Sequence, residues 1–354
     1  MKNDARAFSI FDALNFPTKK SFVRLLWGRL AYVAGLLFVL LLAGEITARL
    51  MGFRPWVEPS QRIKIHPGGS LYAADSLLGY RGRPGRYELR LQDSLDFTVT
   101  HDAEGWRESG ATSDSLPQIW VLGCSFTHGF GVNDPETYVA HLQRHMPDYR
   151  VRNFGMDGYG TLQNWLLLRS LLRTGRKPAL VVLSYGSFHD QRNTANRYWR
   201  KALHGQAVAN GLLYPFIRLD DHDSLHVRYG HLKYHPLPLQ RRLALMSLIE
   251  ERWNRGEDHG LRSRYVTEAL IRGIADASHG AGAHFVLAGV YRHVETSRLL
   301  RKFSLAGLHT VDISQDLSNP LLRILPGNGH PNAMAHELMA DSLYSFLHHV
   351  VRAP

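Results

Sequence analysis

The segment at residues 119–131 constrains the fold of this chain more than any other. An apolar run with β character stops at Gly123, and Ser125 follows two residues later among further glycines. Such a run is typical of a buried strand, and the glycines allow a tight turn directly after it. The pattern therefore predicts a serine hydroxyl at the end of a strand, where parallel sheets bind their ligands.

Strand-like and helix-like segments alternate from residue 118 toward the end of the chain. Apolar runs of strand length lie at 118–123, 150–154, 179–185, 284–291 and 310–313, and segments of helical period separate them. This alternation predicts an α/β domain over residues 118–350, in which helices cover both faces of a parallel sheet. Residues 194–262 interrupt the alternation with many aromatic residues, prolines and histidines, and we expect an insertion or lid there.

An uncharged apolar segment lies near the amino terminus, at residues 30–44. A bilayer core needs about 20 residues of helix, and apolar neighbours extend this segment to an expected anchor at 30–50. Basic residues outnumber acidic ones over residues 1–29, so the positive-inside rule leaves that part in the cytoplasm and exports the rest. The alternatives are a cleaved signal peptide and a buried soluble helix, but neither a cleavage site nor a lipid-acceptor cysteine follows the segment.

The region between the expected anchor and the alternating domain, residues 51–117, is irregular and rich in glycine, proline and serine. Within it, residues 87–91 and 96–100 alternate apolar and polar side chains on either side of a short connection. This pattern predicts a linker with a small β-hairpin that packs beside the main domain.

The composition excludes several classes of function. The formal net charge is +11, but lysine and arginine are scattered rather than clustered, so we expect no nucleic-acid partner. Cys124 is the single cysteine, which rules out an internal disulfide. The lack of further cysteine ligands also argues against a zinc site. The histidines are spread along the chain without a metalloprotease motif. We expect neither a metal nor a cofactor.

Two loops at strand ends carry groups suited to nucleophilic catalysis. Ser125 is the candidate nucleophile, and Cys124 beside it is a competitor that we expect to point into the core, as free cysteines usually do. The glycine loop at residues 153–160 can aim backbone N–H groups at an anion, which is what an oxyanion hole requires.

Two further segments supply histidines near the same edge of the predicted sheet. The loop at 185–193 contains His189 and Asn193. His330 precedes a proline, which favours an extended turn, and the closing helix follows that turn. A serine on an early turn and a histidine on a late loop are the groups that acyl transfer uses.

Together these segments resemble the sequence blocks of the GDSL/SGNH hydrolase superfamily. The first block reads GCSF at residues 123–126, the second combines an asparagine and a glycine within residues 153–158, and the last reads NGHPN at residues 328–332. The resemblance covers about residues 118–350. It implies a three-layer α/β/α sandwich with a flavodoxin-like parallel sheet.

The resemblance also implies roles for individual residues. Ser125 corresponds to the nucleophile and His330 to the base, and the amides of Ser125 and Gly158 belong to the oxyanion hole. A side chain of the third block completes that hole in the family. Here His189 stands where asparagine is usual, and Asn193, slightly further on, is the alternative.

The last block departs from the family pattern, because Asn328 stands where the triad aspartate is expected. An asparagine can orient an imidazole but cannot stabilise an imidazolium by its charge. The machinery is therefore a Ser-His dyad, a slow triad, or an arrangement that depends on another carboxylate such as Asp312 or Asp316.

We therefore expect a single-pass protein of the bacterial inner (cytoplasmic) membrane with a periplasmic carboxyl-terminal domain. Its expected activity is that of a serine esterase or acyltransferase on O-acyl esters, O-acetyl esters in particular, of cell-envelope or exported polysaccharide. The expected partners are an acylated carbohydrate or other ester substrate and the membrane. The alternative is a catalytically impaired protein that binds polysaccharide or a secretion or assembly partner, which the altered third block and Asn328 favour.

Overall fold

A parallel sheet of five strands forms the centre of the larger part of the chain. The computed structural model describes residues 19–58, 63–110, 112–204, 212–324 and 329–351. The strands are β6 (Gln118–Gly123), β7 (Arg150–Gly155), β8 (Leu180–Tyr185), β11 (His284–Gly289) and β12 (His309–Asp312), in the spatial order β12-β11-β8-β6-β7. Along the chain this is the flavodoxin-like order 2-1-3-4-5, whose direction switches between β6 and β8.

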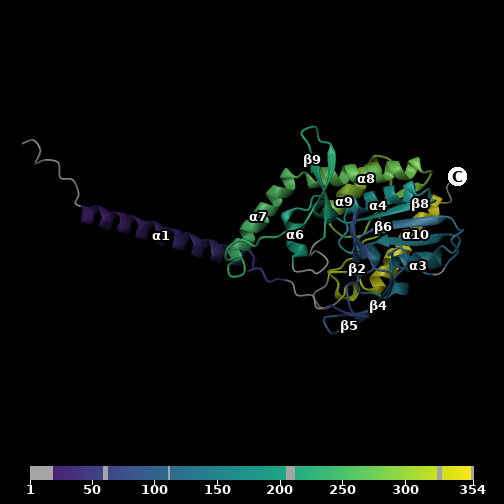
Figure 1. Cartoon of the computed structure of the whole chain (residues 1–354), viewed down its shortest axis with the longest axis horizontal. Coiled ribbons are helices and arrows are strands. Elements are labelled where there is room, and N and C mark those ends of the chain that lie inside the picture. Colours follow the sequence, from purple (N-terminus) through teal and green to yellow (C-terminus); the bar gives the residue numbers. More distant parts are fainter. Residues whose placement is uncertain (1–18, 59–62, 111, 205–211, 325–328, 352–354) are drawn as a thin grey trace, which may run out of the picture. The chain divides into compact units, whose positions relative to one another are not determined.

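Helices cover both faces of this sheet (Figure 1). One face packs against α3 (Tyr138–His145) and α10 (Ala333–Val351), and the other against α4 (Thr161–Arg173), α8 (Ser263–Gly280) and α9 (Val294–Leu305). Alternate residues of β6 enter the two cores, since side chains of a strand point to opposite faces. The expected three-layer α/β/α sandwich with a parallel, flavodoxin-like sheet is confirmed.

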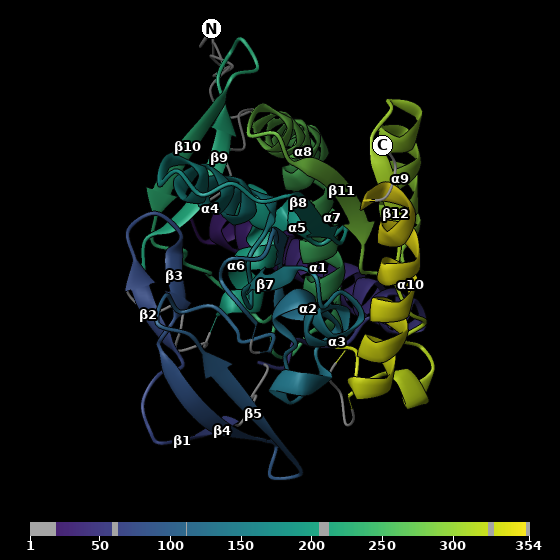
Figure 2. The same cartoon turned by 90° about the vertical axis from the view of Figure 1, so that its right-hand side faces the viewer.

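The region before the sheet is built from short antiparallel strands. The hairpin strands β4 (Gly85–Leu91) and β5 (Leu95–His101) pair where the alternating pattern predicted them, and β1 (Ile63–His66) adds a third strand to β4. The strands β2 (Tyr72–Asp75) and β3 (Gly79–Gly82) form a separate pair. Figure 2 shows the three-stranded sheet projecting away from the parallel one.

The side chain of Arg107 ties this region to the turn that follows β6. It is fully buried and donates to the Asp134 carboxylate over 2.9 Å and to the carbonyl oxygens of His128 and Gly129 over 3.0 and 2.6 Å. It also donates to the carbonyl of Thr98, on β5. Because every donor group of this guanidinium has an acceptor, the ion can remain inside the protein.

In the described parts of the segment expected as an insertion or lid at 194–262, the chain forms two helices and a hairpin. They are α6 (Arg197–Leu203), β9 (Tyr214–Leu219), β10 (Leu225–Gly230) and α7 (Ala244–Gly260), and the short helix α5 (His189–Asn193) precedes them. Trp199 and Tyr214 are buried in the same core as α4 and β8. These parts of the segment are therefore packed on the sheet domain.

The chain divides into two compact units, Glu58–His235 with Trp253–Pro354, and Met1–Val57 with Pro236–Arg252. The smaller unit contains α1 (Lys19–Leu50), which begins before the expected anchor at 30–50. Its segment Val23–Leu50 has a mean hydropathy of 2.1 over its best window and is long and apolar enough to cross a membrane, a property that signal sequences share. In the same unit, the Glu45 carboxylate accepts hydrogen bonds from the first amides of α7, those of Ala244 and Leu245, over 3.1 and 2.9 Å.

Candidate active site

The turn after β6 presents Ser125 at the carboxyl end of the sheet. A Cβ at Gly123 would overlap the Thr127 side chain, so only glycine allows the chain to fold back so sharply. Cys124 is extended and wholly buried in the core under α3 and α10, as expected of a thiol that is not the nucleophile. Ser125 is the first residue of the short helix α2 (Ser125–His128).

His330 comes from the far end of the chain and meets this serine. Its Nε2 lies 2.8 Å from Ser125 Oγ, although the two residues are 205 positions apart in sequence. The His330 carbonyl accepts from the Ile324 amide over 2.9 Å, and the Asn332 side chain both caps α10 at Ala335 and donates to the Leu321 carbonyl. The loop is thus held between a short 3₁₀ turn (Pro320–Leu322) and α10.

The surroundings of His330 keep its imidazole neutral. Burial lowers its pKa to about 4, the Asp157 charge acts in the opposite direction, and the Arg192 guanidinium lowers it further. The rings of Phe126 and Phe130 lie 5.3 and 5.0 Å from the imidazole. Near neutral pH the ring can therefore accept the Ser125 proton, as a general base must.

Two backbone amides in the loops at the ends of β6 and β7 are unused by the fold. Among the residues that the structure describes, no hydrogen bond engages the N–H groups of Ser125 or Gly158. The peptide between Asp157 and Gly158 is fixed because the Tyr80 hydroxyl donates to the Asp157 carbonyl. The Gly158 N–H therefore points away from Tyr80, since carbonyl and N–H are opposed in a trans peptide. Amides of this kind can receive an oxyanion.

The side chains expected to complete the oxyanion hole have different surroundings. The Asn193 amide is buried and engaged at both ends, because its oxygen accepts from the Leu162 amide over 2.9 Å and its nitrogen donates to Thr267 Oγ1 over 2.8 Å. Asn193 thus positions α4 against α8, and both ends of its amide are occupied in this structure.

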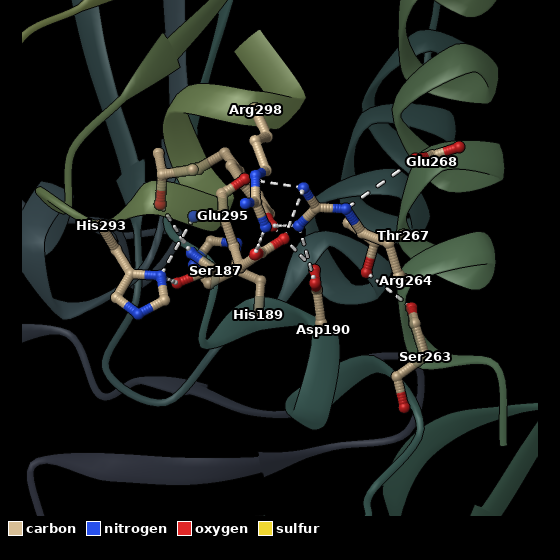
Figure 3. A network of polar contacts seen from close by, with 12 residues as sticks. Ser187, His189, Asp190, Ser263, Arg264, Thr267, Glu268, His293, Glu295 and Arg298 are labelled. Atoms are coloured by element: carbon tan, nitrogen blue, oxygen red, sulfur yellow. Dashed lines mark hydrogen bonds and ion pairs between the residues drawn. The ribbon is translucent and has the colours of Figure 1, made fainter. Parts of the chain in front are cut away.

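His189 is also fully buried, with Nδ1 3.4 Å from Thr161 Oγ1. Its Nε2 has no hydrogen-bond partner within the described parts of the chain. Burial and the Arg192 charge hold its pKa well below the ordinary value, so the ring is neutral. Beside it lies a network in which Arg264 donates to the Asp190 carboxylate over 3.0 Å (Figure 3).

Asp157 is the residue that sequence reasoning missed. Its carboxylate accepts from the Tyr72 hydroxyl and lies 3.2 Å from His128 Nδ1. Burial acts to raise its pKa, but the interactions with His128, Tyr72 and His330 outweigh burial, and the pKa lies below its usual range. Asp157 is thus an anion close enough to His330 to favour its charged form. The signal was its place directly before Gly158 in the second block.

Asp312 and Asp316, the other carboxylates proposed as partners of His330, are engaged elsewhere. Asn328 lies outside the described residues. The Asp312 carboxylate accepts from the Ser314 amide over 3.0 Å, and that of Asp316 accepts from Ser318 and lies 3.6 Å from Arg292. Over the described ranges, no group of three or more His, Cys, Asp or Glu residues could hold a metal ion.

No model of a protein family and no curated protein matches this sequence. Among solved structures, the chain is similar to TesA, at 17% identity over 65% of this chain and 98% of that chain, with a TM-score of 0.38. It is similar to a lipolytic G-D-S-L family protein of Veillonella parvula, at 12% identity over 67% and 100% of the two chains, with a TM-score of 0.39. It is also similar to the C-terminal catalytic domain of Streptococcus pneumoniae peptidoglycan O-acetyltransferase A, at 9% identity over 68% and 97%, with a TM-score of 0.34.

These identities and scores are low, and the fold assignment rests on the strand order and the two helical layers described above. The solved structures that the chain resembles include GDSL proteins and an O-acetyltransferase of the kind that the sequence blocks indicated.

Proposed function

We propose that this protein is a serine esterase or acyltransferase that acts on O-acyl esters, O-acetyl esters in particular, of cell-envelope or exported polysaccharide. The proposal is carried by one observation, the 2.8 Å between Ser125 Oγ and His330 Nε2. The unused amides of Ser125 and Gly158 support it, because a nucleophile, a neutral base and oxyanion donors are together what acyl transfer needs.

The reaction proceeds through an acyl-enzyme. Ser125 Oγ attacks the ester carbonyl carbon and gives its proton to His330 Nε2, while the amides of Ser125 and Gly158 stabilise the oxyanion. Collapse of the tetrahedral intermediate breaks the bond to the alcohol oxygen, which leaves with the proton from His330. A second nucleophile, deprotonated by His330, then releases the acyl group. Water yields an acid, and a sugar hydroxyl yields a new ester.

The surroundings of the nucleophile favour a small acyl group. Ser125 is only 7% exposed. The Phe126 ring packs against those of Phe188, Tyr291 and His330, with centroid distances of 5.7, 6.3 and 5.3 Å. Aromatic walls this close to the base leave little room for a long chain, which supports an acetyl ester over a fatty acyl ester.

We also propose that α1 is a permanent anchor in the inner membrane and that the sheet domain is periplasmic. The contact between Glu45 and α7 supports retention of α1, because cleavage after the apolar segment would leave the first amides of α7 without this acceptor. Alkaline phosphatase and a cytoplasm-only fluorescent reporter, fused separately to the carboxyl terminus, test the orientation. Bright fluorescence with inactive phosphatase would overturn it, and a mature chain that begins beyond Glu45 would overturn the anchor.

The full-length protein in detergent is the material for the catalytic test. We expect turnover of p-nitrophenyl acetate and covalent labelling of Ser125 by a fluorophosphonate, both lost in Ser125→Ala. Cys124→Ala is the matched control and should keep both. Labelling at another residue would place the nucleophile elsewhere.

A second function, binding of polysaccharide or of an assembly partner without catalysis, is favoured by one observation. The Asn193 amide is engaged by the fold at both ends, so the third block supplies no free asparagine for the oxyanion. If a folded protein neither hydrolyses acetyl esters nor reacts with a fluorophosphonate, this second function takes precedence.

A further inference from the structure

The last turns of α1 contact the start of α7 through a closely packed face. Gly44, Glu45 and Ala48 lie on one side of α1, and Ala48 is wholly buried. A Cβ at Gly44 would come within 3.1 Å of the Leu245 side chain, so the small residue allows α7 to approach closely. With the Glu45 carboxylate on the amides of Ala244 and Leu245, this face fixes the start of α7 to the last turns of α1.

This attachment determines the depth at which the start of α7 lies, if α1 spans the membrane as proposed above. The segment Val23–Leu50 is about 42 Å long at 1.5 Å per residue, whereas the hydrocarbon core is about 30 Å thick. Glu45 and Arg49 follow the uncharged stretch at residues 30–44, so the last turns of the helix extend into the headgroup region. The start of α7, bonded to Glu45, lies at that level too.

The turn before α7 and the segment after α1 lie together there. The Trp56 amide donates to the Gln240 carbonyl over 3.0 Å, and the Arg241 guanidinium lies 5.4 Å from the centre of the Trp56 ring. We call residues 51–57 and 237–242 the juxtamembrane elbow. Tryptophan and arginine at this depth are typical of a membrane interface.

The elbow combines exposed apolar side chains with exposed arginines. Met51, Val57 and Leu239 are 55%, 81% and 57% exposed. Arg54 and Arg242 are exposed too, and neither has a carboxylate partner within the described ranges. Apolar side chains among arginines suit a surface that is in contact with lipid and with phosphate at once.

Leu239 adds an independent observation. Its φ is +58°, a left-handed conformation that is strained for a branched side chain, and its carbonyl accepts from the amides of Arg242 and Leu243 over 2.8 and 2.9 Å. The turn thus holds a large apolar side chain outward at the end of α1. Water gives such a side chain no stabilisation, whereas the acyl boundary of a bilayer does.

We propose that the juxtamembrane elbow binds the phosphate headgroups of anionic phospholipids through Arg54, Arg241 and Arg242, with Leu239 inserted into the bilayer boundary. The occupant is a lipid because the elbow continues the surface of a helix that itself runs into the bilayer. Anionic lipid is favoured because the carboxylates of Glu45 and Glu250 are already engaged, by α7 and by Gln240. This inference depends on the proposed anchor but not on the proposed catalysis.

Labelling of an introduced cysteine in the full chain tests the proposal, since the native Cys124 is buried and should not react. Leu239→Cys is compared with the control Leu305→Cys, at a residue that is 80% exposed on α9. Each is reconstituted in nanodiscs of phosphatidylglycerol or of phosphatidylcholine and treated with a water-soluble maleimide. We expect residue 239 to react at least about tenfold more slowly than residue 305 in phosphatidylglycerol, and the ratio to shrink in phosphatidylcholine and in Arg241→Gln/Arg242→Gln.

Each other outcome contradicts a stated part of the proposal. Equal rates at the two positions in phosphatidylglycerol would show that the elbow does not touch the bilayer. Equal protection in both lipids would exclude recognition of anionic headgroups. Extraction of the chain from membranes by alkaline carbonate would overturn the anchor itself. Esterase activity, measured on the same samples, reports separately on the proposed function.

Discussion

The pH dependence of the proposed esterase tests the electrostatics of its base. Burial lowers the pKa of His330 to about 4 from an ordinary value of 6.5, the Asp157 charge opposes that shift, and the Arg192 charge adds to it. Only the neutral ring can accept the proton of Ser125. We therefore expect kcat/KM to stay on its plateau at a pH where an ordinary histidine would already be protonated.

The size of the effect follows from the two pKa values. At about pH 5.5 a histidine with a pKa of about 4 is roughly 97% neutral, whereas one with the ordinary value is roughly 9% neutral. Activity at about pH 5.5 should thus equal that at about pH 7.5 to within a few per cent. An unshifted base would lose about tenfold over the same interval.

The assay is kcat/KM for a nitrophenyl ester between about pH 4 and pH 8, read after an alkaline quench and corrected with Ser125→Ala. Asp157→Asn removes the charge that raises the pKa of His330, so it should move the acidic limb to lower pH. An apparent pKa near 6.5 in the unmodified protein, or a limb that moves upward in Asp157→Asn, would refute the reasoning.

Acid also destabilises the fold, so melting temperature must be recorded at each pH. Burial lowers the pKa values of His101 and His336 to about 3, and that of His189 well below its ordinary range. Between about pH 6.5 and these values, the unfolded chain binds protons that the folded chain does not. Stability is therefore complete above about pH 6.5 and is lost progressively as the pH falls toward the folded-state values.

Four substitutions extend the test. Ser125→Ala should lower kcat by roughly a thousandfold or more without loss of stability, whereas Cys124→Ala should cost about 1–2 kcal/mol of stability and keep the activity, as esterase rates and melting curves will show. Asn328→Asp should raise kcat by about tenfold if residue 328 is the third triad member, because a carboxylate stabilises the imidazolium of His330; an unchanged rate in a folded variant would exclude that role. Arg107→Met should lower the free energy of unfolding by about 3–5 kcal/mol in denaturant titrations, since it leaves a carboxylate and several buried carbonyl groups without their donor.

The sequence alone could predict the elements whose patterns are local. The apolar run at Gln118–Gly123, the glycine after it and the alternation in the β4–β5 hairpin each depend on residues a few positions apart. The spacing of apolar residues and the choice of turn residues are both set by near neighbours in the sequence, so they can be recognised without a structure. The parallel α/β architecture follows from the same alternation repeated along the chain.

The sequence blocks indicated that Ser125 and His330 act together, and the topology of the sheet brings them into contact. Both follow elements whose ends reach the carboxyl edge of one parallel sheet, which allows residues 205 positions apart to approach within 2.8 Å. The side chains of the third block could not be assigned in this way. Only the packing shows that the Asn193 amide hydrogen-bonds to both α4 and α8. The sequence contains no periodic pattern from which the hydrogen-bond partners of a single polar residue could be predicted.

Charge and burial were decided by the tertiary structure alone. Asp157 acts on His330 because Tyr72 and His128, from other segments, hold its carboxylate inside the protein as an anion. In the sequence, Glu45 is only a charged residue at the end of the apolar segment. The fold alone shows that its carboxylate accepts hydrogen bonds from the amides of α7. Electrostatic interactions depend on distance and desolvation in three dimensions, and neither quantity is contained in the order of residues along the chain.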